Sequence, residues 1–265
     1  MLLAGKVAVI VGGSGAIGSA VAHAMVREGA NVFLGARNQE KLDRAAGSIR
    51  QAGGTVETFV TDVLDLQDIS EQIRRLALQT GGIDVVVNAT GFKHVQGKNI
   101  ENLSLPEFLT GITPFISAQF TLAKAVAPHM GGARAGAIIS VVAPAASMAM
   151  PGHLGHIAGC AATEAFIKAL ASELGPHNIR VLGVRSHAIV DAVQAGSYTG
   201  DIFTTKAQSM GLSVEQWLDG VAQSTMIQRL PTLMQIAETI TFLASDRAGA
   251  MTATVVNITA GATVS

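Results

Sequence analysis

The chain has 265 residues, of which 49% are hydrophobic and 14% charged, and its formal net charge is −1 at pH 7. This length suits one α/β domain with a large buried core, and the near-neutral charge excludes a basic surface for nucleic acid or an anionic membrane. No apolar run in the sequence approaches the roughly 20 residues that span a bilayer, so we expect no membrane partner.

Short apolar runs alternate with longer amphipathic stretches, which is the pattern of strand–helix–strand units in a parallel sheet. The runs that predict strands are Lys6–Gly12, Asn31–Ala36, Thr55–Thr61, Ile83–Ala89, Gly136–Val142, Ile179–Arg185 and Thr254–Ile258. The stretches that predict helices are Ala16–Glu28, Gln39–Gln51, Leu66–Gln79, Leu105–Met130, Gly155–Leu174 and Thr232–Ser245. Continuously apolar strands indicate helices on both faces of the sheet. We therefore predict a Rossmann-type, doubly wound α/β fold with a seven-stranded parallel sheet, and one domain over residues 1–265.

One long irregular segment, residues 186–231, interrupts this alternation and contains short helical patterns. A segment of that length inside a compact domain is usually a lid or a binding loop. Its large apolar and aromatic side chains predict an apolar cover over a small-molecule substrate, and they are Tyr198, Phe203, Met210, Trp217 and Met226.

Cysteine content and the first residues predict the compartment. The only cysteine, Cys160, cannot form an internal disulfide, so a reducing cytoplasm is expected. Residues Met1–Lys6 lead directly into the first predicted strand, and we expect no signal peptide there. The mean hydropathy of +0.41 is high for a protein outside membranes and predicts that other subunits cover part of the apolar surface.

A glycine-rich turn, Val11-Gly12-Gly13-Ser14-Gly15-Ala16-Ile17-Gly18, joins the first predicted strand to the first predicted helix. Glycines let the backbone turn tightly and bring a pyrophosphate against the N–H groups of the helix N-terminus. The strand before the turn and the helix after it are the context that a dinucleotide site requires. The expected cofactor-binding residues here are Gly12, Ser14, Ala16, Ile17 and Gly18.

The residue that ends the second predicted strand indicates which dinucleotide binds. An acidic side chain there would accept a hydrogen bond from the ribose 2′-OH of NAD. The chain instead has Arg37, whose planar, permanently charged guanidinium suits a 2′-phosphate. This favours NADP(H) over NAD(H).

The turn resembles the TGxxxGxG fingerprint of the short-chain dehydrogenase/reductase family, with Val11 and Ala16 in place of the family's threonine and central glycine. Further landmarks follow in the family's order over nearly the whole chain. Thr61-Asp62-Val63 resembles the Asp-Val pair that contacts adenine, and Asn88-Ala89-Thr90-Gly91 resembles the NNAG motif after the fourth strand. The resemblance thereby adds to the expected cofactor-binding residues Asp62, Val63, Asn88, Ala89 and Gly91.

The same resemblance implies a catalytic set of Asn, Ser, Tyr and Lys, in which the tyrosine hydroxyl moves a proton while hydride passes to or from nicotinamide. When the family's spacing is laid on this chain, Phe115 falls at the asparagine and Ala143 at the serine. His156 falls at the tyrosine and Cys160 at the lysine. All four groups are therefore predicted to be replaced.

Histidines gather on the segments that border the family's substrate pocket, namely His94, His153, His156 and His187. An imidazole with a pKa near its usual 6.5 is a competent general acid or base, so His156 is our candidate in place of tyrosine. Cys160 is a nucleophile only if a neighbour such as His156 activates its thiol, and the alternative is a small core residue. The spacing of His153, His156 and Cys160 also fits zinc, but no carboxylate or further cysteine accompanies them, and we predict no metal.

Two functions follow. The first is an NADP(H)-dependent oxidoreductase that acts on a carbonyl, hydroxyl or imine group through a non-standard site centred on His156. The alternative is a non-redox enzyme or a catalytically inactive binding or partner protein of the same fold. The apolar helical runs Phe115–Val126 and Ala158–Ala171 need cover on two sides, and with the family resemblance they predict a homodimer or homotetramer.

Overall fold

Parallel strands form the centre of the structure, a computed structural model that describes residues 1–197 and 199–264. In chain order the strands are β1 (Val7–Val11), β2 (Asn31–Ala36), β3 (Val56–Val60), β4 (Val85–Asn88), β5 (Gly136–Val142), β6 (Ile179–Ser186) and β7 (Thr254–Ile258). Their order in the sheet is β3-β2-β1-β4-β5-β6-β7. The chain changes direction across the sheet between β1 and β4, where ligands of such sheets bind at the carboxyl ends of the strands.

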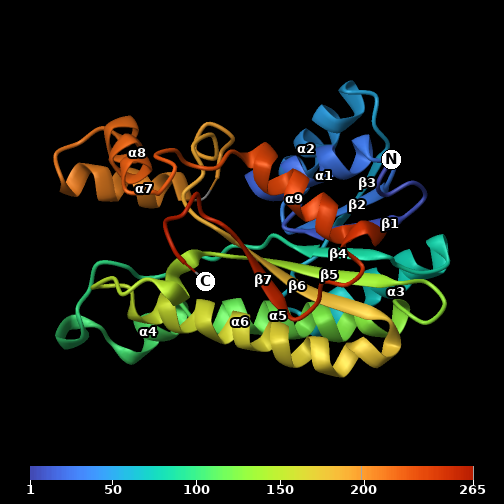
Figure 1. The fold of residues 1–265 in the computed structure, drawn as a ribbon. Coiled ribbons are helices and arrows are strands. Elements are labelled where there is room, and N and C mark those ends of the chain that lie inside the picture. Colours follow the sequence, from blue (N-terminus) through green and yellow to red (C-terminus); the bar gives the residue numbers. More distant parts are fainter. Residues whose placement is uncertain (198, 265) are drawn as a thin grey trace.

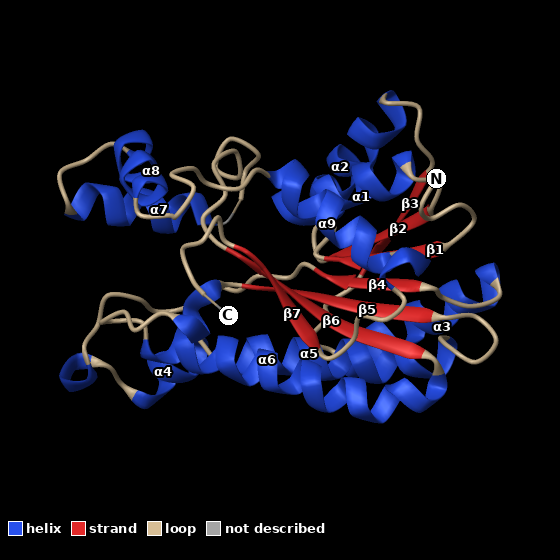
Figure 2. Ribbon diagram, in the orientation of Figure 1, coloured by secondary structure: helices blue, strands red, loops and turns tan. Residues whose placement is uncertain are grey.

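Helices cover both faces of the sheet (Figure 1). One face carries α1 (Ala16–Arg27), α2 (Gln39–Gln51) and α9 (Leu233–Ala244). The other carries α3 (Leu66–Thr80), α5 (Thr113–Val126) and α6 (Leu154–Leu174), as Figure 2 also shows. The predicted doubly wound fold with a seven-stranded parallel sheet is confirmed. Among the described residues, no helix is long and apolar enough to cross a membrane.

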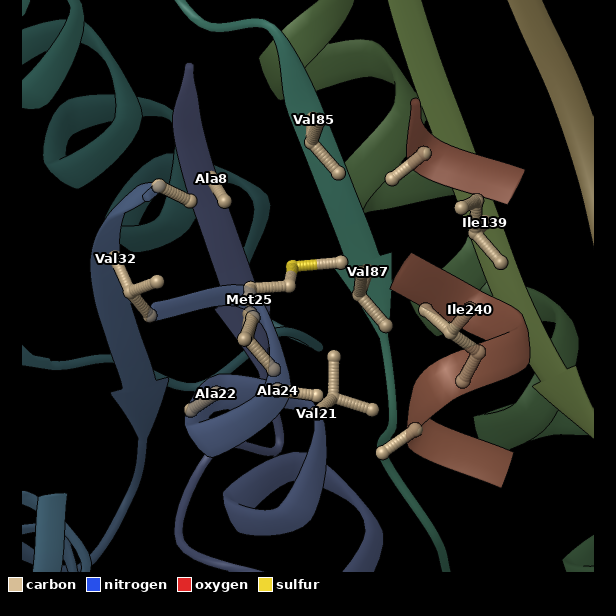
Figure 3. Packing of buried hydrophobic residues seen from close by; sticks show 14 of the residues in the cluster. Ala8, Val21, Ala22, Ala24, Met25, Val32, Val85, Val87, Ile139 and Ile240 are labelled. Carbon is tan, nitrogen blue, oxygen red and sulfur yellow. The ribbon is translucent and has the colours of Figure 1, made fainter. Parts of the chain in front are cut away.

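The core lies in two layers, one on each side of the sheet. Figure 3 shows the layer under α1 and α9, where Met25 of α1 points at Val87 of β4 beside Ile240 of α9. All three side chains are fully buried. Strands buried on both faces explain why their sequences are continuously apolar rather than alternating.

Replacing a buried leucine of this layer tests the packing. Leu34 of β2 has no exposed surface, and Leu34→Ala is expected to lower the free energy of unfolding by about 2–5 kcal/mol, because a cavity adds to the lost burial. The matched control is Leu78→Ala on α3, where the side chain is 72% exposed and the expected change is within about 0.5 kcal/mol. Urea unfolding followed by circular dichroism measures both, and equal losses would contradict the prediction.

The predicted helix over Leu105–Met130 is wrong in one respect, because the structure breaks it in two. α4 (Leu105–Thr110) ends at Gly111, and α5 begins at Thr113. Pro114 has no N–H to donate to the carbonyl four residues earlier, so one continuous helix cannot pass through it. Gly111 also lies against α6, since a Cβ at Gly111 would come within 2.5 Å of the Gly155 carbonyl carbon. The other predicted elements agree with the structure to within two residues.

Within the predicted lid, residues 186–231, the structure places α7 (Thr199–Ser209) and α8 (Val214–Gln223). The two helices pack against each other beyond the carboxyl ends of the strands (Figure 1). Tyr198, which the sequence included in the apolar cover, lies outside the described residues. Single 3₁₀ turns complete the described elements and are Ile100–Asn102, Ala127–His129, Pro144–Ser147, Gly175–His177 and Asp246–Ala248.

Candidate active site

A cavity of about 420 Å³ opens at the carboxyl ends of β4, β5 and β6. Its walls come from the loops after these strands, the first turns of α5 and α6, and the helices α7 and α8. The four histidines that the sequence predicts near a substrate pocket all line this cavity, and they are His94, His153, His156 and His187. The topology therefore gathers residues from distant parts of the chain into one site.

The four positions assigned by the family's spacing also meet in this cavity. Phe115 enters from α5, Ala143 follows β5, and His156 and Cys160 lie one turn apart on α6. The neighbouring Ser140 is absent from the lining, and its hydroxyl donates to Oε1 of Gln119 at 2.7 Å. Ser140 therefore bonds to α5, to which Gln119 belongs.

His156 lies inside a cluster of aromatic rings. Its imidazole stacks on His94, with ring centroids 4.1 Å apart and an interplanar angle of 15°. The Phe115 ring lies 5.5 Å from His94 and 5.7 Å from His156 and meets both at steep angles. Phe92 packs on the edge of Phe115 at 5.3 Å. The cluster restricts the orientation of the His156 ring.

Hydrogen bonds determine the tautomer of His94. Its Nδ1 lies 2.9 Å from the Phe92 carbonyl oxygen, which can only accept, so Nδ1 carries the proton. Its Nε2 then accepts from the side-chain amide of Gln96 at 2.7 Å. Burial also lowers the pKa of His94, which keeps the ring neutral. Gln96 belongs to no sequence motif, so the sequence does not predict it as a residue of this site.

His156 is 8% exposed, and this burial, together with the nearby His94 and His153, lowers its pKa to about 3. The imidazole is therefore neutral at pH 7, which corrects the expected pKa near 6.5. A neutral imidazole still has one N–H to donate and one nitrogen to accept. At pH 7 the ring can therefore donate one hydrogen bond, and it carries no positive charge.

Cys160 lies close to His156, with its Sγ 3.9 Å from Nδ1 and 3.8 Å from Nε2. Burial raises the pKa of the thiol to about 12, so the thiol stays protonated at pH 7. The activation that a nucleophilic Cys160 would need is therefore missing. Cys160 is 3% exposed and belongs to the core under α6, as the alternative interpretation expected.

A buried ion pair lies one turn beyond Cys160. Arg185 of β6 donates from Nε and Nη2 to the two carboxylate oxygens of Glu164, both at 2.9 Å. The Nη1 group of Arg185 is buried and has no partner in the part of the chain that the structure describes. The pair ties α6 to the end of β6 and thereby holds His156 over the cavity. Residues 21 positions apart show no local pattern, so the sequence could not identify the pair.

The buried histidines make stability depend on pH. An unfolded histidine has a pKa of about 6.5, so between that pH and about 3 the unfolded chain binds more protons than the folded one at His156. Stability is therefore fully present above pH 6.5 and falls as the pH drops, by up to about 1.4 kcal/mol per pH unit for this ring. Urea unfolding at pH 7 and pH 5 measures the loss. His156→Phe should reduce the slope, and an unchanged slope in the variant would contradict the assignment.

The glycine-rich turn packs too closely for side chains. Gly12 has φ +82°, and a Cβ there would lie 2.6 Å from the Ala89 carbonyl carbon. A Cβ on Gly18 would lie 2.3 Å from the carbonyl oxygen of Gly12. At the N-terminus of α1, Gly15 provides no side-chain cap, and the first turn holds no acidic residue. The helix end is thus a cradle for an anionic group, and it fits a dinucleotide pyrophosphate.

The remaining expected cofactor residues lie along the same edge of the sheet. Asp62 accepts from the Leu64 N–H at 3.0 Å, and the Val63 carbonyl accepts from the Thr121 hydroxyl. Asn88 is 2% exposed, and its side-chain nitrogen has no partner among the described residues. Among all the expected cofactor-binding residues, those that also line the cavity are Ile17, Ala89 and Gly91.

Arg37 is exposed and lines a second pocket of about 700 Å³ beside the first. Lys41 and Lys93 line it as well, so three cations border one hollow. The pocket shares Gly91 and Phe92 with the main cavity. This basic hollow adjoins the end of β2.

Within residues 1–197 and 199–264, no group of three His, Cys, Asp or Glu side chains is placed to hold a metal ion.

Comparison with known proteins shows a match of residues 6–197 to the family model of short chain dehydrogenases. The chain is 30% identical over 261 residues to the 3-oxoacyl-(acyl-carrier-protein) reductase FabG of Chlamydia muridarum, with 98% of each chain covered. It is 28% identical over 260 residues to the 2,3-dihydro-2,3-dihydroxybenzoate dehydrogenase of Bacillus subtilis, covering 98% of this chain and 97% of that one.

Solved structures match over nearly the full length. A dehydrogenase/reductase from Sinorhizobium meliloti 1021 is 26% identical, with a TM-score of 0.80 over 99% of this chain and 96% of that one. An NAD⁺-bound xylitol dehydrogenase superimposes with a TM-score of 0.86 at 23% identity, over 98% of this chain and all of that one. At that identity the second match shows the fold alone.

Proposed function

Because this chain belongs to the short-chain dehydrogenase family of oxidoreductases, we propose that it binds NADP(H) and reduces or oxidises a small substrate at a site centred on His156. The reacting group is a carbonyl, a hydroxyl or an imine. One observation carries the proposal: residues of the cofactor edge, Ile17 and Gly91, line the same cavity as His156. A bound nicotinamide and a substrate would therefore share one compartment.

The chain's own residues suit NADP(H). The turn before α1 would hold the pyrophosphate, and Asp62 and Val63 would border the adenine, as the family resemblance implies. Arg37 and Lys41 would pair with the 2′-phosphate in the basic hollow. When bound, the cofactor supplies the hydride donor or acceptor.

His156 would act on the substrate oxygen or nitrogen as a neutral hydrogen-bond donor. Its ring faces a largely apolar cavity, where a hydrogen bond to developing negative charge is stronger than in water. A neutral imidazole fills such a role in enzymes whose site depresses the histidine pKa. The stack on His94 and the edge of Phe115 keep the ring in place, so little reorganisation is needed.

The protonation states of the site favour a second candidate function. At pH 7 the His156 imidazole is neutral and the Cys160 thiol is protonated, so neither group is an acid or a nucleophile of the usual kind. In that case the chain is a non-redox enzyme or a catalytically inactive binding or partner protein that keeps the family's fold. Such a protein has no need of a tyrosine–lysine pair.

Titration with NADPH and NADH separates the two functions. Calorimetry gives both affinities, and absorbance at the nicotinamide band then follows NADPH oxidation with a panel of aldehydes, ketones and imines. Micromolar NADPH binding with turnover of one panel member supports the first function. Failure of both nucleotides to bind would reject it in favour of the second.

We also propose a homodimer or homotetramer that pairs α5 and α6 with those of another copy. Phe120 lies on a face of α5 that leaves it 50% exposed. A large apolar side chain on such a face suggests cover by a partner. Light scattering is expected to return a multiple of the 27.2 kDa chain mass, and Phe120→Glu should lower it. A monomer mass for the unaltered chain would contradict this.

A further inference from the structure

The main cavity carries one cation from the lid. Its lining is mostly apolar, and Lys206 of α7 is the single Lys, Arg, Asp or Glu side chain among the described residues that line it. The other described polar groups of the lining are amides, hydroxyls, imidazoles and a thiol. Lys206 therefore stands out chemically from everything around it.

Lys206 lies beside an aromatic ring, and no carboxylate offsets its charge among the described residues. Its Nζ lies 5.9 Å from the centre of the Trp217 ring on α8, and Trp217 packs on Phe203 at 4.9 Å. No carboxylate pairs with Lys206 among the residues that the structure describes. Burial and, second to it, the charge of Lys206 lower the pKa of His187, which lines the same cavity. Burial lowers the pKa of Lys206 itself, as expected for an ammonium that has lost water and gained no anion.

We propose that Lys206 binds a carboxylate of the substrate, so that the substrate class is an apolar, most simply aromatic, acid with its reacting group remote from the carboxylate. Both residues line the cavity, Lys206 from α7 and His156 from α6. Figure 1 shows α7 and α6 on opposite sides of the space beyond the carboxyl ends of the strands. A substrate that spans the cavity would present its carboxylate to Lys206 and its reacting group to His156. Trp217, Phe203 and Met150 line the same cavity and suit an apolar body.

The inference rests on the proposed function only in treating this cavity as the substrate site, and its test needs no hydride transfer. Trp217 is the only tryptophan of the chain, and it touches Lys206, so its fluorescence reports binding at this point. The probes are benzoate, phenylacetate and cyclohexanecarboxylate, which do not emit in the tryptophan window, each paired with its methyl ester. The ester keeps the apolar body and removes the charge.

The acids are expected to bind at least about tenfold more tightly than their esters, because a charge-assisted hydrogen bond forms in a partly desolvated site. Lys206→Met should abolish that preference, and Lys206→Arg should keep it. The matched control is Gln208→Met, which lies exposed on the same helix and should keep the preference of the unaltered chain.

Equal binding of acids and esters, or a preference that survives in Lys206→Met, would overturn the inference. So would the absence of binding by all three acids. The cofactor is a second source of anions, and a loss of NADPH affinity in Lys206→Met would assign Lys206 to its phosphates instead. A chain that binds the acids through Lys206 but never oxidises NADPH would reject the proposed function and leave this inference standing.

Discussion

His156→Phe is expected to lower kcat by about 10²- to 10³-fold and to leave NADPH affinity unchanged, because it removes a positioned hydrogen-bond donor and nothing that contacts the nucleotide turn. Phenylalanine fills the same space and can still stack on His94, whose ring lies 4.1 Å from that of His156. The loss of activity would then come from the missing N–H rather than from a collapsed cavity. Steady-state kinetics with the active panel substrate and calorimetry with NADPH measure the two effects.

Cys160→Ala is the contrasting variant. Because the Cys160 thiol is buried and protonated, its removal is expected to change kcat by less than about tenfold, whereas loss of a true nucleophile costs far more.

The pH dependence of kcat is an independent check on His156. With the pKa of His156 near 3, kcat should show no inflection near pH 6.5 from this ring. Unchanged kcat in His156→Phe would remove His156 from the mechanism.

Arg37→Asp is expected to reverse the cofactor preference. Charge-assisted hydrogen bonds to a phosphate are worth about 1.5–3 kcal/mol, which corresponds to a loss of roughly 10- to 100-fold in NADPH affinity. The new carboxylate would repel the 2′-phosphate further, and it would accept a hydrogen bond from the free 2′-OH of NADH. NADH affinity should therefore rise while NADPH affinity falls.

Arg44→Asp is the matched control for charge. Arg44 lies on α2 and is exposed, where it pairs with Glu40 at 3.6 Å, but it does not line the basic hollow. We expect its ratio of NADPH to NADH affinity to stay close to that of the unaltered chain, since exposed charges at a distance are screened by salt. If Arg37→Asp left the ratio unchanged, Arg37 would be an ordinary surface residue and the NADP(H) preference would lose its support.

The sequence by itself determined the fold and the location of the dinucleotide crevice. Both depend on signals that act over a few residues: apolar runs of strand length, amphipathic helices, and a glycine turn between β1 and α1. Even the break at Pro114 was a local signal, since the missing N–H is visible in the residue type, although the prediction passed over it. The family's spacing likewise placed Phe115, Ala143, His156 and Cys160 in what proves to be one cavity.

The tertiary structure alone decided what those residues are able to do. Burial and the nearby His94 lower the pKa of His156, and His94 comes from the loop after β4, far from His156 in the sequence. Lys206 enters the cavity only because the lid folds over β6, and Gln96 matters only because it faces His94. The pKa of a group and the strength of an ion pair both depend on how far the surrounding side chains exclude water. That exclusion is set by contacts between residues far apart in sequence, which no local pattern records.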